Sequence, residues 1–225
     1  MKKLTIAIDG PAGAGKSTVA QIAARCLKYT YIDTGAMYRA VTWLAMTRKI
    51  SPQNSQALTD EVCKVDLKLE LVEDKTMVYV DGIDVTEQIR TPEVSRKVAE
   101  IAQIPEIREV LILKQREMAR LGGVVMDGRD ISSCVLPDAD VKIFLTASIE
   151  ERAKRRWQEL ISTGVNVSLK NITHDIASRD KKDYEREIAP LKQVPDAMLI
   201  DTTGLTIEDT VQRILDACKE RSGVV

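Results

Sequence analysis

The sequence predicts an α/β protein, in which a five-stranded parallel sheet has helices on both faces and carries a small antiparallel β insertion. Two observations support this fold class: short apolar runs alternate with segments of helical periodicity, and one internal stretch instead alternates residue by residue. The chain has 225 residues, of which 44% are hydrophobic and 30% charged. That length and composition suit one globular domain of generous size.

Five short apolar runs are the expected strands of the parallel sheet. Each is short and mostly apolar, which is typical of strands buried on both faces. The first ends before Gly10, and the apolar positions that follow fall at helical spacing. Two later helices begin with capping-box sequences, at Ser148 to Glu151 and at Thr206 to Asp209. The five runs cover residues 4–9, 29–33, 124–127, 141–145 and 198–201.

A stretch of alternating polarity interrupts this rhythm at residues 65–72 and again at residues 77–85. A period of two predicts strands with one solvent-exposed face, and the Asp81-Gly82 pair predicts a hairpin turn. We therefore expect an antiparallel hairpin or three-stranded sheet as a small appended subdomain. Helical periodicity returns over residues 93–121, with a break expected near Pro105.

The charge balance and the cysteines narrow the class of protein. The 33 basic and 34 acidic residues give a formal net charge of −1. This balance does not indicate a protein that binds nucleic acid. No run approaches the roughly 18 apolar residues of a membrane span, so we expect a protein of the cytoplasm. We also expect it to be a monomer. The four cysteines are too scattered for a zinc site or a disulfide framework, and reduced, mostly buried thiols are expected.

The segment GPAGAGKS at residues 10–17 matches the phosphate-binding loop, and it has the required strand before it and helix after it. Successive backbone N–H groups wrap a phosphate chain there, and the following helix directs its positive end at the anion. Lys16 then reaches the β and γ phosphates, and Ser17 offers its hydroxyl to Mg²⁺. The alternative is a glycine-rich turn that leads into a helix. The expected ATP-binding residues are Gly10, Pro11, Ala12, Gly13, Ala14, Gly15, Lys16, Ser17 and Thr18.

The loop alone does not name the reaction, because kinases, GTPases and motor ATPases share it. The Asn-Lys-x-Asp segment by which common GTPases read their base is absent from the sequence. A translocating ATPase needs more chain and a basic surface. The acceptor must therefore be sought elsewhere.

Several arginines lie beside acidic or turn residues at expected strand or helix ends, where the ligand crevice of such a sheet opens. Forked guanidinium groups suit a second phosphate better than ammonium groups do. Taken singly, each arginine reads as a surface or salt-bridged residue. Together they predict a second anion site, and Ile172, Ile176, Arg179, Asp183 and Arg186 can share one helix face. The arginines concerned are Arg39, Arg108, Arg129, Arg179 and Arg186.

Two further features bear on catalysis. The helix that opens at Ser148 carries Arg152, Arg155 and Arg156, which suits either an arginine-bearing lid over the transferring phosphate or a basic surface helix. Asp127, at a strand end, suits either a contact to Mg²⁺ through water or a structural role in a turn.

With these residues in hand, the chain resembles the bacterial cytidylate kinases, which are CMP/dCMP kinases of the nucleoside monophosphate kinase family. The resemblance runs from residue 4 to about residue 215, and the combination of motifs is far more specific than the phosphate-binding loop alone. The matching segments are residues 8–18 (IDGPAGAGKST), 33–39 (DTGAMYR), 89–94 (IRTPEV), 127–130 (DGRD), 137–139 (PDA), 151–156 (ERAKRR) and 179–191.

The resemblance implies transfer of the γ-phosphoryl group from Mg·ATP to CMP or dCMP within a single P-loop kinase domain. It implies a core at about residues 1–40, 105–150 and 190–225, an insertion that binds the nucleoside monophosphate at about 60–104, and a short lid at about 151–189. Lys16, Arg129, Arg152 and Arg156 are the implied catalytic residues. The implied CMP contacts are Arg39, Arg129 and Arg186 to the phosphate, Arg179 and Asp183 to the ribose, and Thr34, Arg108 and Asp130 to the cytosine or its surroundings.

The chain departs from the family pattern at two places. Ala99 stands where a serine often assists recognition of the cytosine amine, so discrimination against UMP is expected to be weaker. Ser132 and Ser133 replace the usual Gly-Thr, with no derivable effect. Two alternatives stay open: a kinase of UMP or another small acceptor, and a nucleotide-sensing protein that binds ATP to control a partner.

Overall fold

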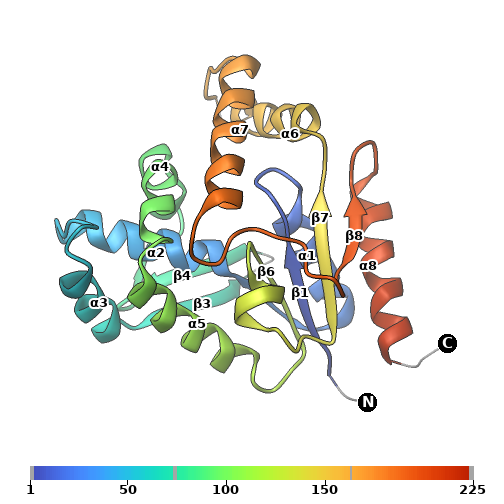
Figure 1. Ribbon diagram of the computed structural model, residues 1–225, viewed down its shortest axis with the longest axis horizontal. Helices are drawn as coiled ribbons and strands as arrows, with labels where there is room; N and C mark the ends of the chain where they lie inside the picture. The colour runs from blue at the N-terminus through green and yellow to red at the C-terminus, as the bar shows by residue number, and fades with distance from the viewer. Residues whose placement is uncertain (1–2, 73–74, 163, 223–225) are drawn as a thin grey trace. The chain divides into compact units, whose positions relative to one another are not determined.

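The computed structural model describes residues 3–72, 75–162 and 164–222 (Figure 1). The chain divides into two compact units. Unit 1 comprises Met1–Tyr31 and Gly122–Val225, and unit 2 comprises Ile32–Leu121. The phosphate-binding loop and the expected lid belong to unit 1, whereas the antiparallel insertion belongs to unit 2.

A five-stranded sheet has the strand order β2-β6-β1-β7-β8, and β1 pairs in parallel with both β6 and β7. The strands predicted from the apolar runs are confirmed. Their bounds are Thr5–Asp9 for β1, Thr30–Asp33 for β2, Val124–Gly128 for β6, Val141–Thr146 for β7 and Met198–Asp201 for β8. The central position of β1 brings the loops that follow β6 and β7 next to the loop that follows β1.

Helices α1 (Lys16–Leu27) and α8 (Ile207–Ser222) pack beside each other against this sheet (Figure 1). Their apolar faces join the strands in one core that includes Ile6, Ile143 and Ile214, all fully buried. The predicted capping box of α8 is confirmed, because the Asp209 N–H donates to Thr206 Oγ1 at 3.0 Å and the Thr206 N–H donates to Asp209 Oδ2 at 3.4 Å.

Helices α6 (Ile149–Ser162) and α7 (Leu169–Glu185) form a hairpin with a small core of its own, built on Ala153, Ile172 and Ile176. One prediction for this region is wrong. Arg186 does not share a face of α7, because the helix ends at Glu185 and Arg186 has an extended backbone with ψ of 138°.

Unit 2 contains the antiparallel sheet β3-β4-β5, as the alternating pattern predicts. Asp81 and Gly82 both have positive φ, 51° and 76°, which suits the tight turn between β4 and β5. The predicted helix break is confirmed, since α4 ends at Ile101 and α5 begins at Pro105. The bounds are α2 Thr34–Thr47, α3 Ser55–Lys64, β3 Leu67–Val72, β4 Lys75–Val80, β5 Ile83–Asp84, α4 Pro92–Ile101 and α5 Pro105–Ala119, with a 3₁₀ turn at Gln88–Arg90.

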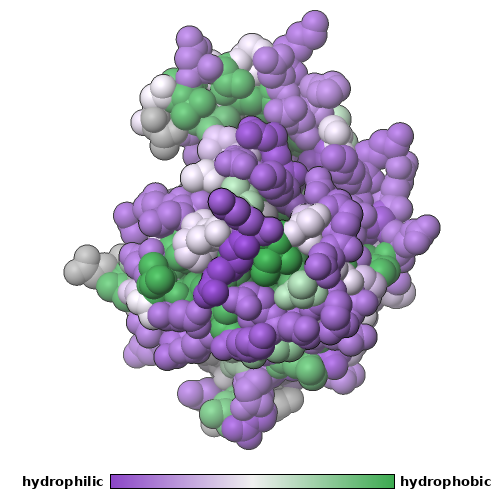
Figure 2. Space-filling model, turned by 90° about the vertical axis from the view of Figure 1, so that its left-hand side faces the viewer, coloured by the Kyte–Doolittle hydropathy of each residue, from purple (hydrophilic) through white to green (hydrophobic). Residues whose placement is uncertain are grey.

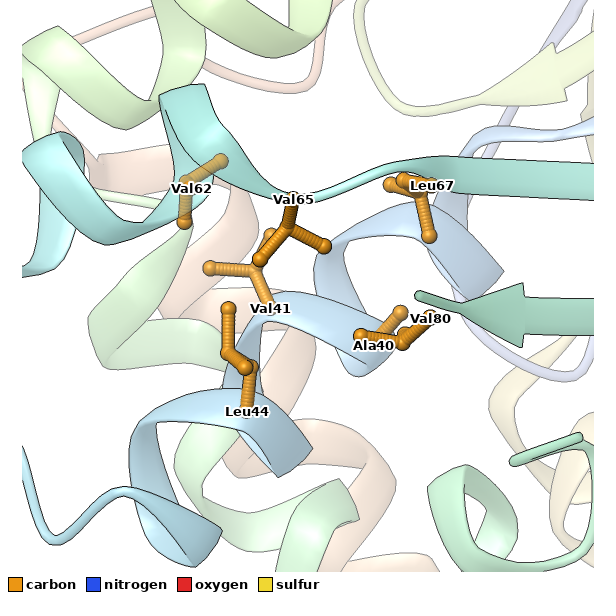
Figure 3. A pocket seen from close by; sticks show the side chains of 7 residues that line it. All are labelled: Ala40, Val41, Leu44, Val62, Val65, Leu67 and Val80. Atoms are coloured by element: carbon orange, nitrogen blue, oxygen red, sulfur yellow. The ribbon is translucent and has the colours of Figure 1, made fainter. Parts of the chain in front are cut away.

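The core of unit 2 is apolar and closely filled. A small cavity of about 10 Å³ lies between α2, α3 and the sheet, and aliphatic side chains such as Val41, Val62 and Val80 line it (Figure 3). This space holds at most one water molecule and offers it no polar side chain, so the cavity is a packing gap and not a ligand site.

The face of the molecule shown in Figure 2 is mostly hydrophilic, with hydrophobic residues in small groups. Within the described ranges, none of the helices combines the length and apolar character needed to span a bilayer. The prediction of mostly buried thiols is wrong: Cys26 and Cys63 are exposed, Cys134 is half-buried, and Cys218 is buried. Cys26 and Cys63 lie on the solvent-facing sides of α1 and α3, and Cys134 lies in the short helical turn after β6.

Gln115 on α5 is fully buried, and its amide nitrogen and oxygen have no hydrogen-bond partner among the described residues. Such an orphaned amide costs about 1–3 kcal/mol. We expect Gln115→Met to raise the free energy of unfolding by about 1 kcal/mol in urea denaturation, because the unbranched thioether fills similar space. Gln212→Met on the exposed face of α8 is the matched control and should change stability by less than about 0.5 kcal/mol. A loss of stability in Gln115→Met alone would contradict this account.

Candidate functional site

The loop between β1 and α1 has the backbone that the motif requires. At Gly10, with φ of +150°, a Cβ atom would lie 2.0 Å from the carbonyl oxygen of Leu145 on β7. Gly13 and Gly15 also have positive φ, +77° and +86°, and Gly15 is the N-cap of α1. These conformations favour glycine, and they leave the main chain of the loop without side chains at three positions.

Lys16 is the first residue of α1, and its side chain lies across the loop, where Nζ donates to the Pro11 carbonyl at 2.8 Å. Burial, with the positive charges of Arg129 and Arg179, lowers the pKa of Lys16 to about 7, although Asp127 opposes them. Lys16 therefore sits in a strongly positive and dehydrated place. An anion bound there would raise this pKa and restore the charge of the ammonium group.

Ser17 and Asp127 meet at the end of β6. Ser17 Oγ donates to Asp127 Oδ2 at 3.0 Å, and the Tyr31 hydroxyl donates to Asp127 Oδ1 at 2.8 Å. A hydroxyl and a carboxylate beside a phosphate site are the hard oxygen ligands that suit Mg²⁺, directly or through water. The Tyr31 bond fixes the carboxylate, which gives Asp127 a structural role, and its contact to Mg²⁺ through water stays a prediction.

Arg152 joins the start of α6 to the phosphate-binding loop. The guanidinium donates to the Ala147 carbonyl at 3.0 Å and to the Ala12 carbonyl at 3.1 Å, and it pairs with Asp180 of α7 at 2.7 Å. The side chain is 7% exposed. Arg152 thus ties the loop, α6 and α7 together.

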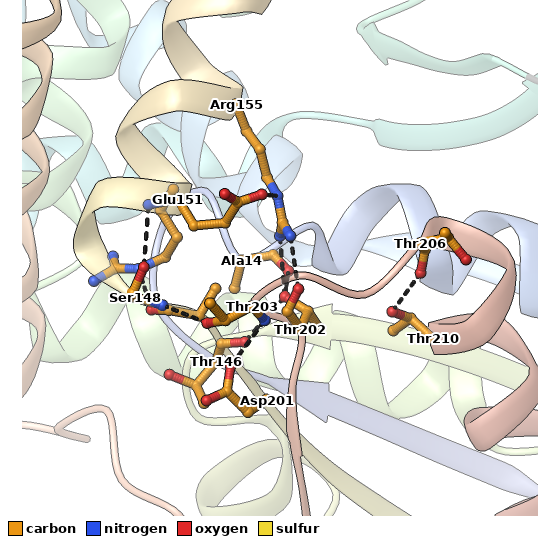
Figure 4. Close-up of polar contacts among 12 residues, drawn as sticks. Ala14, Thr146, Ser148, Glu151, Arg155, Asp201, Thr202, Thr203, Thr206 and Thr210 are labelled. Carbon is orange, nitrogen blue, oxygen red and sulfur yellow. Dashed lines mark hydrogen bonds and ion pairs between the residues drawn. The ribbon is translucent and has the colours of Figure 1, made fainter.

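Arg155 makes a second link; the sequence placed it among the candidate lid arginines but not among the implied catalytic residues. Its guanidinium donates to Thr202 Oγ1 at 3.0 Å and to the Thr202 carbonyl at 2.8 Å, and Glu151 pairs with it at 3.0 Å (Figure 4). Arg156 instead pairs with Glu159 and is 42% exposed. Sequence spacing could not separate the two arginines, because residues three and four positions after Arg152 both share its helix face.

Two ion pairs connect the turn after β6 to the end of α7. Arg129 Nε lies 2.8 Å from Asp183 Oδ2, and Arg186 Nη2 lies 3.2 Å from Asp130 Oδ1. Burial acts to raise the pKa of Asp183, but Arg129 and the neighbouring arginines outweigh it and hold the pKa below its usual range. The structure therefore gathers arginines close enough to Lys16 to lower its pKa.

The remaining predicted residues gather in unit 2. Asp33, at the end of β2, caps α2 through the Ala36 N–H at 2.8 Å and pairs with Arg39 at 2.9 Å. Arg108 is 3% exposed and lies 5.9 Å from the centre of the Tyr38 ring. Thr34, the first residue of α2, is also buried. Apart from the exposed Arg156, the predicted site residues thus form one group in unit 1 and a second in unit 2, which consists of Thr34, Arg39 and Arg108.

The glycine loop and the buried Lys16, with arginines close to them, define a phosphate-binding-loop protein. A family profile described as "Cytidylate kinase" matches residues 6–220. Cytidylate kinases from Bacillus thuringiensis (strain Al Hakam) and Bacillus cereus (strain AH187) are each 50% identical over 214 residues, which is 95% of this chain and 95% of each relative. The chain belongs to the cytidylate kinase family, as its motifs predicted.

A solved structure of an uncharacterized protein from Eubacterium ventriosum ATCC 27560 superposes with a TM-score of 0.51. The alignment covers 95% of this chain and 97% of that one at 14% sequence identity. At that identity the likeness speaks for the fold alone.

Proposed function

We propose that this nucleoside monophosphate kinase transfers the γ-phosphoryl group of ATP to CMP and dCMP, which gives CDP or dCDP and ADP. The observation that carries this proposal is the pairing, within unit 1, of a phosphate-binding loop at Lys16 with the half-buried arginines Arg129 and Arg186. The loop would hold the donor phosphates, and the two arginines suit the acceptor phosphate.

The donor side binds ATP through the loop N–H groups and Lys16. Ser17 and Asp127 are the residues that would hold Mg²⁺, which supplies neutralisation of phosphate charge when it is bound. Lys16 would exchange its bond to the Pro11 carbonyl for the phosphates, and the bound anion would raise the lowered pKa and keep the ammonium charge.

The acceptor is already an anion, so the reaction needs no strong general base. An oxygen of the CMP phosphate forms a bond to the γ-phosphorus, and the bond from that phosphorus to the β–γ bridging oxygen breaks. Arg129, Arg186 and Arg39 would hold the acceptor phosphate, and Arg152 and Arg156 would steady the transferring group. Catalysis is then positioning and charge neutralisation in a site from which water is excluded.

Base selection is assigned to Thr34, Arg108 and Asp130, and ribose binding to Arg179 and Asp183. Burial supports these assignments for Arg108 and Asp130, which are 3% and 6% exposed. Buried polar groups of this kind reject a base that cannot pair with them, since UMP offers a carbonyl where CMP offers an amine.

The wild-type protein should show the highest kcat/KM with CMP or dCMP in a coupled assay that measures ADP production across CMP, dCMP, UMP and AMP. We expect kcat/KM for UMP to be lower by about tenfold or more, because its carbonyl would face the buried polar groups. A preference for UMP or AMP would contradict the proposal. Negligible turnover with every acceptor, despite ATP binding, would instead favour the nucleotide-sensing alternative.

Three organisational features belong to the same proposal. Residues 60–104 would serve as the insertion that binds the nucleoside monophosphate, and residues 151–189 as the lid, with the core at residues 1–40, 105–150 and 190–225. The small core between α6 and α7 supports the lid assignment, since it lets the hairpin act as one piece. The enzyme would act as a monomer in the cytoplasm.

A further inference from the structure

Asp9 links the phosphate-binding loop to the turn that carries two proposed acceptor residues. It is the last residue of β1 and is 2% exposed, and the next residue, Gly10, opens the loop. Its carboxylate reaches the chain that follows β6. Oδ1 accepts the Ile131 N–H at 2.7 Å, and Oδ2 accepts the Ser132 N–H at 2.8 Å.

These two N–H groups open the short helical turn Ile131–Val135. The first N–H groups of a helical turn have no partner within it and need an external acceptor. Asp9 supplies one carboxylate oxygen to each of them. Burial raises the pKa of Asp9, while the hydrogen bonds from Ser132 and Ile131 act against that rise. This contact gives Ser132 a main-chain role that its side chain did not reveal.

The main chain of Asp9 holds the same turn from the other side. In the sheet register Asp9 is the partner of Gly128, which directly precedes Arg129. Asp9 therefore holds both ends of the Arg129-Asp130 turn. Its backbone pairs with the residue before the turn, and its side chain binds the two residues after the turn. Arg129 and Asp130 then reach Asp183 and Arg186 from a turn anchored at both ends.

We propose that Asp9 is a positioning residue that holds Arg129 and Asp130 in register with the donor loop. This role rests on the proposed function, because it matters only if these two residues bind the acceptor. Asp9 touches neither nucleotide in this account. It acts through the turn, so its loss should weaken use of CMP and spare binding of ATP.

The test is Asp9→Asn, which keeps the shape of the side chain but turns an amide N–H₂ group toward a backbone donor. We expect kcat/KM for CMP to fall about tenfold to a hundredfold, the range that loss of one charge-assisted hydrogen bond gives. The dissociation constant of ATP, measured by calorimetry, should stay within about twofold. Asp140→Asn is the matched control, since Asp140 accepts the Thr5 N–H at 2.9 Å at the other end of β1; it should leave CMP kinetics unchanged.

Unchanged CMP kinetics in Asp9→Asn, or an equal loss of ATP affinity, would overturn the role. An equal fall of kcat/KM for CMP in Asp140→Asn would show that Asp9 only stabilises β1. If Asp9→Asn does not fold, amide hydrogen exchange in the wild type decides: the Ile131 and Ser132 N–H groups should exchange slowly, and exchange at the rate of an open loop rejects the contact. If the wild type does not use CMP, the proposed function is wrong, whereas the exchange result still tests the contact of Asp9.

Discussion

Replacement of Arg186 by alanine is expected to lower kcat/KM for CMP by about a hundredfold to a thousandfold, with the dissociation constant of ATP changed by less than about threefold. The Arg186 side chain is 6% exposed and pairs with Asp130. Its removal takes away a guanidinium group suited to a phosphate and leaves the Asp130 carboxylate buried without that partner, a combination that costs about 2–5 kcal/mol. Steady-state kinetics with varied CMP, together with ATP titration, measure the two effects.

Lys142→Ala is the matched control for this prediction. It removes an ion pair of unit 1, 2.6 Å from Lys142 to Asp196, that lies outside the proposed site. The control should leave the kinetics with CMP unchanged. Equal losses of CMP use and ATP affinity in Arg186→Ala would show that Arg186 is not an acceptor residue.

Lys16→Met should reduce the rate of phosphoryl transfer by about a thousandfold or more and weaken ATP binding. The methionine keeps the stem of the side chain but removes the ammonium group that would contact the phosphates as charge moves to the leaving ADP. Single-turnover measurements with saturating ATP and CMP separate the rate of transfer from binding. A transfer rate within tenfold of the wild type would contradict the role of Lys16.

The lowered pKa of Lys16 gives this prediction a second readout. In the ATP-free protein the pKa is about 7, so the amine is mostly neutral above pH 7. Bound phosphates favour the ammonium form, and ATP binding must then take up a proton. Affinity for ATP should therefore fall as pH rises from about 7 to 9, and calorimetry in buffers of different ionisation enthalpy should detect the proton. Lys16→Met should abolish the uptake, and its persistence would assign the proton to another group.

Local patterns predicted most of the fold. The apolar runs, the helical spacing and the Asp81-Gly82 turn each reflect forces that act within a few residues, and the strands and the helix break near Pro105 follow from them. The phosphate-binding loop is likewise contiguous in the sequence. Its glycine positions, Lys16 and Ser17 could therefore be predicted together with their surroundings.

Contacts between distant segments could not be predicted in the same way. Asp9 and Ile131 are 122 positions apart, and no local signal joins them. Arg155 and Arg156 are equivalent by helical spacing, and only the tertiary placement of Thr202 selects Arg155. Arg186 looked like part of a helix face because the sequence pattern gave no sign that α7 ends one residue earlier.

Gly10 shows how one position of a motif can be dictated by something other than the ligand. A Cβ atom there would lie 2.0 Å from the carbonyl oxygen of Leu145, so the strand beside it already excludes every other residue. At Gly15 the nearest atom to such a Cβ is 3.9 Å away, and only the backbone conformation requires glycine. A descendant that had lost nucleotide binding would therefore still keep Gly10. Its presence in a sequence is a signature of the architecture, whereas Lys16 and Ser17 are the informative markers of the chemistry.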